Sequence, residues 1–288
     1  MKVKTLAVAV LAASLSAPAF SDQQDITFIV AGKTSNYRQH PAGNTTALNY
    51  HFFAEIFLQE NGVVEPASLN TPLDGGVAVP FNDGGYALEL HGGRYASEAE
   101  LEASYPDGNY IFHYAAPSIG SVSQAVPLEN PKIDGSGLPA APVIYLSQNG
   151  ETVTAQAIDP ELDLQVTWSE FVSGSADPLG ITDDLLFVIM GDCEGVRRAH
   201  SGRPFEGTGY LTYADTSFTI ETQRLKPENA YQLSVEHAVL DTSREHDVIA
   251  YATFATSTFL DIKTTGTAAP GEACPQIRKA FDAGQTDR

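Results

Sequence analysis

Basic side chains concentrate in one short segment of this sequence. Arg197, Arg198, His200 and Arg203 lie within seven positions, in a chain that has only 16 lysines and arginines. Arginine presents a planar fork of donors that matches carboxylate and sulfate groups. These four residues are therefore a candidate ligand-binding site for an anion. A solvated loop whose charges pair with neighbouring acids would explain the same residues.

A second candidate site lies in the N-terminal half. His91, Arg94 and Tyr95 surround the pair Gly92-Gly93, which would let a ligand approach the backbone closely. A polysaccharide lyase needs a charge neutraliser, a base and an acid, and these three side chains can serve in those roles. A glycine-rich hairpin turn followed by a capped helix accounts for the same segment without any chemistry.

Acidic residues form a third group, which could bind calcium. Calcium takes six to eight oxygen ligands, but no Asp-x-Asp-x-Asp-Gly loop with a distal glutamate is present. We therefore expect no metal site from sequence motifs and no other cofactor. The acidic residues concerned are Asp159, Glu161, Asp163, Asp183 and Asp184.

The motifs of several enzyme classes are missing from the sequence. It contains no Gly-x-Ser-x-Gly, no His-Glu-x-x-His and no phosphate-binding glycine motif. These absences exclude motif-bearing hydrolases and nucleotide-binding enzymes. They leave glycosidases and lyases open, because the catalytic residues of those enzymes come from scattered strands.

The N-terminus has the layout of a secretory signal peptide. Lys2 and Lys4 precede the apolar stretch Leu6–Leu15, and the small residues of Ala17-Pro18-Ala19 follow. Cleavage is expected after Ala19 or Ser21. The apolar run is too short to span about 30 Å of hydrocarbon, so we expect a secreted or periplasmic protein without a membrane span.

The charge of the chain is strongly acidic, with 36 Asp and Glu against 16 Lys and Arg and a net charge of −20. Nucleic acids and anionic membranes attract basic surfaces. We therefore expect neither as a partner. The sequence leaves the oligomeric state open.

The chain contains two cysteines, Cys193 and Cys274. In an exported protein such a pair predicts one disulfide bond. Two cysteines at this separation match neither a zinc site nor a Cys-x-x-Cys redox pair.

The second half of the chain shows strand patterns and a family resemblance. Alternating apolar and polar residues predict strands at 162–169, 216–222 and 231–239, and the apolar run 184–190 predicts a central strand. Leu225, Pro227 and Tyr231 precede the last of these strands, as at the corner between strands E and F of fibronectin type III domains. Trp168 matches the buried tryptophan of that fold. The segment 139–266 thus resembles a fibronectin type III or immunoglobulin-like domain, which implies a tyrosine corner at Tyr231.

The first half is less regular. Strands are expected at 25–31, 49–59, 85–91 and 110–114, with Ser97 and Glu100 placed as a helix capping box. The run 96–112 (ASEAELEASYPDGNYIF) is similar to a segment of uncharacterised secreted bacterial proteins, in which it precedes a fibronectin-like domain. That resemblance extends over the whole mature chain and implies an architecture but no activity.

The fold expected from these patterns is all-β, with two β-sandwich domains in tandem. Pro, Gly and Ser crowd together at 127–142, which is typical of a boundary between domains. The predicted divisions are a signal peptide (1–21), an N-terminal sandwich (22–138), a fibronectin-like sandwich (139–266) and a tail (267–288).

Because no catalytic set is assembled, we expect an exported non-catalytic binding or interaction protein whose partner is an extracellular glycan or a surface protein. The alternatives are a secreted polysaccharide lyase or hydrolase and a structural component of an extracellular assembly.

Overall fold

A computed structural model describes residues 25–64, 66–73, 78–129 and 137–277. The predicted signal peptide and residues 278–288 of the predicted tail lie outside this part of the chain. The described residues form an all-β structure with one short α-helix and one 3-10 turn, which confirms the predicted fold class. No helix in this part of the chain is long and apolar enough to cross a membrane.

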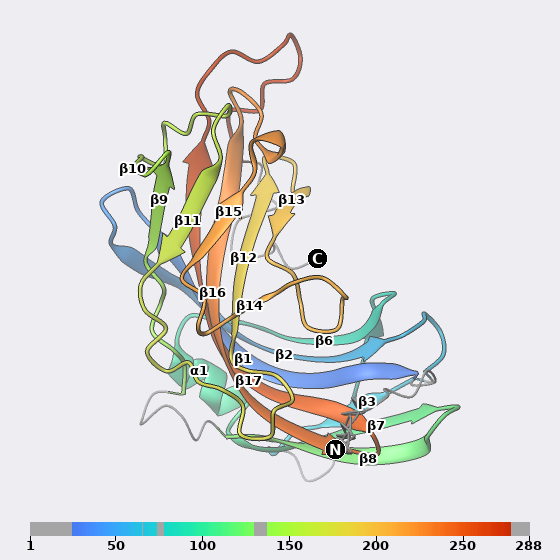
Figure 1. Cartoon of the computed structure of the whole chain (residues 1–288). Coiled ribbons are helices and arrows are strands. Elements are labelled where there is room, and N and C mark those ends of the chain that lie inside the picture. Colours follow the sequence, from blue (N-terminus) through green and yellow to red (C-terminus); the bar gives the residue numbers. More distant parts are fainter. Residues whose placement is uncertain (1–24, 65, 74–77, 130–136, 278–288) are drawn as a thin grey trace, which may run out of the picture.

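One large sheet of nine strands extends through the whole molecule (Figure 1). Its strands run in the order β13-β12-β16-β17-β1-β2-β6-β5, and β14 pairs with β12 beside this path. The strands are β1 (Ile26–Gln39), β2 (Thr45–Leu58), β5 (Asn82–Asp83), β6 (Ala87–Tyr95), β12 (Leu185–Asp192), β13 (Arg197–His200), β14 (Leu211–Thr212), β16 (Ala230–Glu245) and β17 (Val248–Lys263).

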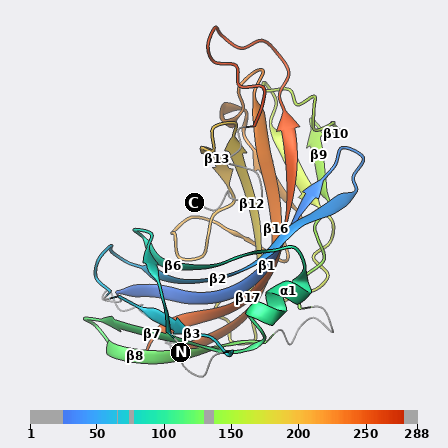
Figure 2. The same cartoon turned by 180° about the vertical axis from the view of Figure 1, so that it is seen from behind.

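Two smaller sheets pack on the outer side of this bent sheet, one on each arm of the bend (Figures 1 and 2). The first runs in the order β4-β3-β7-β8 and the second in the order β10-β9-β11-β15. Their strands are β3 (Ser68–Asn70), β4 (Ala78–Pro80), β7 (Gly108–Ala116), β8 (Gly120–Leu128), β9 (Ile144–Gln148), β10 (Glu151–Thr152), β11 (Leu164–Trp168) and β15 (Ser217–Ile220).

Each outer sheet encloses its own hydrophobic core against the large sheet. The N-terminal core contains Phe52, Tyr110 and Phe112, and the C-terminal core contains Trp168 and Tyr231. Both cores lie on the convex side of the large sheet, because the outer sheets are there. Each outer sheet therefore forms a β-sandwich with the part of the large sheet that it covers, as expected for a β-sandwich fold.

The two sandwiches share the large sheet. β17 lies in the predicted second domain, yet it pairs in parallel with β1 from Phe28–Ile249 to Arg38–Phe259 and antiparallel with β16 along its whole length. Its first half contributes Val248, Ala250, Ala252 and Phe254 to the N-terminal core. The sequence patterns predict that each half carries its own sheets. They do not reveal the pairing of β1 with β17, because the paired residues of these two strands lie more than 200 positions apart in the chain. The domain boundaries themselves stay a prediction.

The corner expected at Tyr231 is present. The Tyr231 hydroxyl accepts a hydrogen bond of 2.7 Å from the backbone N–H of Lys226, five residues upstream. Leu225 is buried in the same core, and Trp168 is 9% exposed. These contacts fix the chain reversal that leads from the short 3-10 helix η1 (Thr222–Arg224) into β16. The fibronectin-like identity of this half stays a proposal.

Residues 137–142, the described end of the segment predicted as a linker, and the start of β9 are held to the large sheet by buried hydrogen bonds. The Thr256 hydroxyl donates to the Pro139 carbonyl at 2.7 Å. The Gln39 side chain accepts from the Ile144 N–H at 2.7 Å and donates to the Ile144 carbonyl at 2.8 Å. The Gln39 amide, paired through both its oxygen and its nitrogen, therefore fixes the start of β9 against β1.

The predicted disulfide bond between Cys193 and Cys274 is present, with the two Cα atoms 6.1 Å apart. It joins the end of β12 to the C-terminal segment, which also pairs with the start of β16 through a 2.8 Å bond from the Ala230 N–H to the Cys274 carbonyl. The bond therefore closes the far end of the C-terminal sandwich.

The helix α1 (Glu98–Ser104) lies on the outer side of the bend, as Figure 2 shows. Ser97 caps it as predicted, accepting from the Glu100 N–H at 3.3 Å, and the Glu100 carboxylate accepts from the Ala96 N–H at 3.0 Å. Leu101 is fully buried and anchors the helix to the N-terminal core.

Candidate binding face

The inner side of the bend is the concave face of the large sheet, and no second sheet covers it in the described part of the chain (Figures 1 and 2). Side chains alternate between the two faces of a strand. Residues that neighbour core residues therefore point into the concavity, and they include members of both sequence-predicted clusters. We call this surface the concave face; its residues used below are Phe28, Asn36, Arg38, Asn49, His51, Phe53, Glu55, Phe57, Glu89, His91, Arg94, Phe187, His200, Glu236, Tyr251, Ser257 and Asp261.

A network of polar side chains crosses the middle of this face. The Asn36 amide donates to Asn49 Oδ1 at 2.9 Å and lies 3.3 Å from His51 Nδ1. Arg94 Nη1 donates to the same Asn49 oxygen at 2.9 Å. Asn36 and Asn49 are buried, whereas Arg94 is exposed. The network thus has a rigid floor of amides and a charged rim at the edge of the sheet.

The polar row continues across the shared strands. Asn36 on β1 lies beside Ser257 on β17, and Ser257 lies beside Glu236 on β16. The Ser257 hydroxyl donates to the Glu236 carboxylate. Amides, a hydroxyl, a carboxylate and a guanidinium therefore follow one another across five adjacent strands, and together they can both donate and accept hydrogen bonds.

An aromatic group lies on the same face at a distance from this polar row, because Phe28 precedes Asn36 by eight residues of β1, or roughly 26 Å at about 3.3 Å per residue. The rings of Phe28 and Phe57 stack at 4.3 Å, and Tyr251 meets Phe28 edge-on at 5.3 Å. Phe205, from the loop between β13 and β14, lies 5.8 Å from Phe28 and keeps 42% of its surface exposed. The concave face therefore offers ring surfaces and hydrogen-bonding groups at separate places along its strands.

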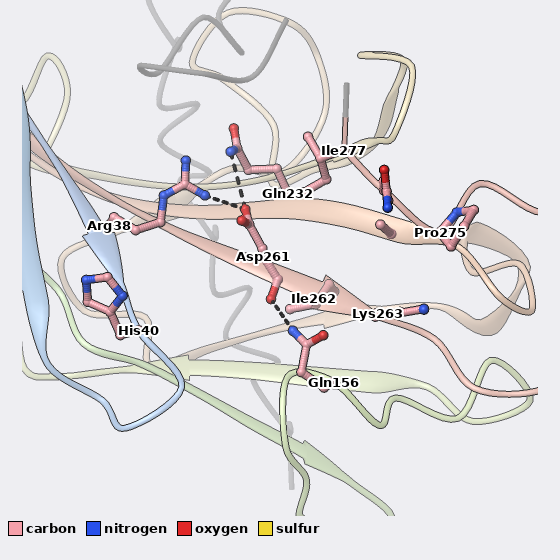
Figure 3. A pocket seen from close by; sticks show the side chains of 11 residues that line it. Arg38, His40, Gln156, Gln232, Asp261, Ile262, Lys263, Pro275 and Ile277 are labelled. Carbon is pink, nitrogen blue, oxygen red and sulfur yellow. Dashed lines mark hydrogen bonds and ion pairs between the residues drawn. The ribbon is translucent and has the colours of Figure 1, made fainter. Parts of the chain in front are cut away.

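A pocket of about 550 Å³ opens at the end of the concave face that lies opposite the aromatic group (Figure 3). Arg38 and Gln232 both point toward Asp261 there, and Arg38 Nη1 lies 2.5 Å from Asp261 Oδ1. Gln156 donates to the Asp261 backbone carbonyl at 3.2 Å. The Arg38 and Asp261 charges neutralise each other, and Lys263 adds one further positive charge to the lining of this pocket.

The structure brings together two of the three residues of the predicted lyase group. His91 and Arg94 point into the concave face, and the positive charges of Arg94 and His91, after burial, help to lower the pKa of His51 to about 3. Tyr95 packs instead against the N-terminal core on the opposite face, and its hydroxyl donates to the Gly92 carbonyl at 3.0 Å. A β-bulge between His51 and Phe53 shifts the register of β2 and β6 in this region.

The predicted anion site is also divided. Arg198 Nε and Nη2 bind Asp192 Oδ2 at 2.6 and 2.5 Å, so its donor fork is occupied. The His200 ring points to the concave face and accepts from the Gly202 N–H at 2.8 Å. Burial, then Arg203 and Arg197, lower the pKa of His200 to about 4. Arg197 and Arg203 therefore remain the available cations of this cluster.

The two predicted clusters lie at opposite edges of one sheet. β13 and β6 are separated by six strand intervals, which corresponds to about 29 Å along the sheet at roughly 4.8 Å per interval. A single small ligand cannot contact both edges. An extended chain lying across the strands can.

Several of the acidic residues considered for calcium accept hydrogen bonds from backbone N–H groups instead. Asp184 is fully buried, and its two oxygens accept from the Leu240 and Ser175 N–H groups at 2.7 and 2.8 Å. Asp183 accepts from the Asp177 N–H, and Asp163 from the Thr222 N–H, both at 2.9 Å. Within the described ranges, no group of three His, Cys, Asp or Glu side chains could hold a metal ion.

Three histidines, His237 buried and His51 and His200 partly buried, predict that the protein loses stability in acid. Burial, the largest cause in each case, lowers the pKa of His51 to about 3 and those of His200 and His237 to about 4. In the unfolded chain these rings bind protons below a pH of about 6.5, whereas the folded rings stay neutral. The stabilisation is therefore complete above about pH 6.5 and declines toward pH 4, by at most about 1.4 kcal/mol per histidine and pH unit.

The measurement is urea unfolding between pH 7.5 and 4.5. The core histidine His237 stacks on Phe171 at 4.4 Å, so His237→Gln should flatten the pH dependence. Exposed His40 provides the matched control, since His40→Gln should leave the slope unchanged. An unfolding free energy that stays constant across this range would contradict the burial of neutral rings.

Sequence reasoning missed the polar centre of the concave face. β1 was expected to end at residue 31, but it continues to Gln39. From Lys33 to Arg38 both faces of the strand carry polar groups, so no alternation of apolar and polar residues marks this part. Asn36 and Asn49 could have been found only from the pairing of β1 with β2.

Comparisons with known proteins identify no family for this chain. No family model and no curated protein matches it. Among solved structures, the yeast delta-COP-I mu-homology domain complexed with a Dsl1 WxWxV peptide is similar over 83% of this chain and 98% of that chain, at 11% identity. The TM-score of 0.21 is too low to support any argument about fold or function.

Proposed function

We propose that this protein is an exported, non-catalytic binding protein that holds an extended, hydroxyl-rich chain such as a glycan across its concave face. The observation that carries the proposal is the polar row from Arg94 through Asn49 and Asn36 to Ser257 and Glu236, with stacked aromatic rings farther along the same face. Binding sites commonly combine apolar surface with a few placed polar groups.

The chemistry of the row suits sugar hydroxyls. Each amide side chain offers a donor and an acceptor, and each hydroxyl of a sugar does the same. The net charge of −20 disfavours anionic polymers, which leaves neutral glycans as the better class of ligand. The predicted export would bring the protein into contact with such polymers.

Replacement of Arg94 by alanine is expected to weaken glycan binding by about 10- to 100-fold, because a hydrogen bond to a charged group contributes about 1.5–3 kcal/mol. A glycan array with wild-type protein would identify the ligand, and calorimetry would measure the affinity of each variant. Arg94 is exposed at the rim, so the substitution should leave folding intact.

Tyr145→Ala is the matched control, since this exposed side chain lies on the outer sheet. Equal loss of affinity in both variants, or saturable binding that Arg94→Ala leaves unchanged, would contradict the concave face as the site. A structural role in an assembly would show instead as self-association without ligand.

A secreted polysaccharide-active enzyme is the second candidate, and one observation favours it. Glu55 and Glu89 lie directly opposite each other on β2 and β6, with His91 Nε2 3.4 Å from Glu89. Paired carboxylates are the usual catalytic groups of glycosidases. Release of reducing or unsaturated ends from a polysaccharide panel, abolished by Glu89→Gln, would establish this function in place of simple binding.

A further inference from the structure

Lys33 is among the largest fully buried side chains of the described structure. Only 1% of its side-chain surface is exposed. It points to the convex side of β1, where its register partners are Phe52 and Phe254, and its Nζ lies 5.9 Å from the centre of the Phe254 ring. Lysine is almost never buried to this extent unless it is paired.

The Lys33 amine meets two carboxylates. Its Nζ lies 2.5 Å from Asp107 Oδ1 and 2.6 Å from Glu102 Oε1. Charge pairing requires only one of them, and the two carboxylates repel each other. The side chains of Glu102 and Asp107 are 41% and 52% exposed, so the amine lies on the dry side of the cluster and the carboxylates border solvent.

Both carboxylates are held by rigid elements. Glu102 belongs to α1, which Leu101 anchors in the core. Asp107 belongs to the turn before β7, and the Tyr110 hydroxyl fixes this turn by donating to the Pro106 carbonyl at 2.8 Å. The Tyr105 ring, between these two residues in the chain, stacks at 4.2 Å on Phe52, the β2 partner of Lys33.

We propose that Lys33 and Asp107 form an intramolecular isopeptide bond, with Glu102 as the proton carrier. The Asp107 carboxyl carbon is one bond from Oδ1, so it lies no more than about 3.7 Å from the amine, close to the 3–3.5 Å from which bonds form. Such fixed neighbours react with effective concentrations far above those in solution.

The reaction balances without a further reactant. A proton passes from the Lys33 ammonium to the Asp107 carboxylate, which leaves a neutral amine and a carboxylic acid. The amine nitrogen then bonds to the Asp107 carboxyl carbon while Glu102 takes a second proton from the nitrogen and returns it to the departing oxygen. One carbon–oxygen bond breaks, one amide forms, and one water molecule leaves through the exposed side of the cluster.

The bond would connect the large sheet to an outer sheet. β1 belongs to the nine-stranded sheet, and Asp107 precedes β7 of the N-terminal outer sheet. Cys193–Cys274 closes the end of the C-terminal sandwich. An exported protein would thus carry one covalent lock in each sandwich, which limits opening by proteases or by force.

Mass spectrometry of the natively purified, reduced protein tests the proposal. We expect a mass lower by one water than that of the unlinked chain. Trypsin should yield peptide 95–132 joined to a peptide that ends at Arg38, and the free peptide 34–38 should be missing, because trypsin does not cleave after an acylated lysine.

Three variants define the roles. Lys33→Met and Asp107→Ala should restore the full mass, and Glu102→Gln, which keeps Lys33 paired with Asp107, should slow formation of the bond by about 100-fold. Glu100→Gln on the same helix is the control and should link normally. A folded wild-type protein that retains full mass and releases peptide 34–38 would overturn the proposal, and a Lys33–Glu102 amide would overturn the assignment of Asp107.

Discussion

A fragment of residues 22–138, the whole predicted N-terminal domain, is expected to show no cooperative unfolding transition. Without β17, the parallel edge of β1 loses all eleven residue pairs from Phe28 to Arg38. The N-terminal core also loses four buried residues that β17 supplies: Val248, Ala250, Ala252 and Phe254. An exposed sheet edge and an incomplete core both favour aggregation over folding. Thermal unfolding followed by circular dichroism is the measurement.

The full mature chain provides the control, and a point variant makes the same test without truncation. Phe254→Ala should lower the free energy of unfolding by about 3–5 kcal/mol. Hydrogen exchange should then accelerate in β7 and β8, although these strands lie more than 100 residues from the substitution. A fragment that unfolds cooperatively, or exchange confined to the C-terminal sandwich, would show that the first sandwich is independent of β17.

Removal of the disulfide bond by Cys193→Ser and Cys274→Ser is expected to lower the free energy of unfolding by about 4–5 kcal/mol in the chain-entropy model. The bond closes a loop of 81 residues that contains β13 to β17. Urea unfolding of the double variant beside oxidised and reduced wild type measures the effect.

Reduced wild type should match the double variant, which separates loss of the cross-link from the effect of the substitutions themselves. Cys193 is 2% exposed, so a serine hydroxyl there adds a small burial cost that the comparison reveals. A loss below about 1 kcal/mol would mean that the backbone pairing of Cys274 with Ala230 already holds the C-terminal segment in place.

The predictions that needed only local patterns agree with the structure. Alternation marked the strand that contains Trp168, and the apolar run 184–190 became most of β12. The corner at Tyr231 and the cap at Ser97 are also local, because each joins groups within five residues. The signal-peptide pattern made a disulfide bond between the two cysteines the natural expectation.

The candidate site could be predicted only in part. The two clusters chosen for their chemistry contain residues of the concave face, His91 and Arg94 at one edge and His200 at the other. The sequence could not predict that both clusters belong to one surface, because this depends on the order of the strands in the sheet. Tyr95 was wrongly grouped with them, because neighbouring residues of a strand point to opposite faces and Tyr95 therefore faces the core when Arg94 faces the concavity.

The sequence by itself thus determined the class of structure, several of the strands, the corner and the cysteine pair, since periodicity and short-range hydrogen bonds act within a few residues. The tertiary structure alone decided that β17 joins both halves, that Asn36 and Asn49 meet Arg94, and that Lys33 meets Asp107. These contacts join residues far apart in the chain. They arise from strand pairing and from the enclosure of two cores on one sheet, which no local pattern records.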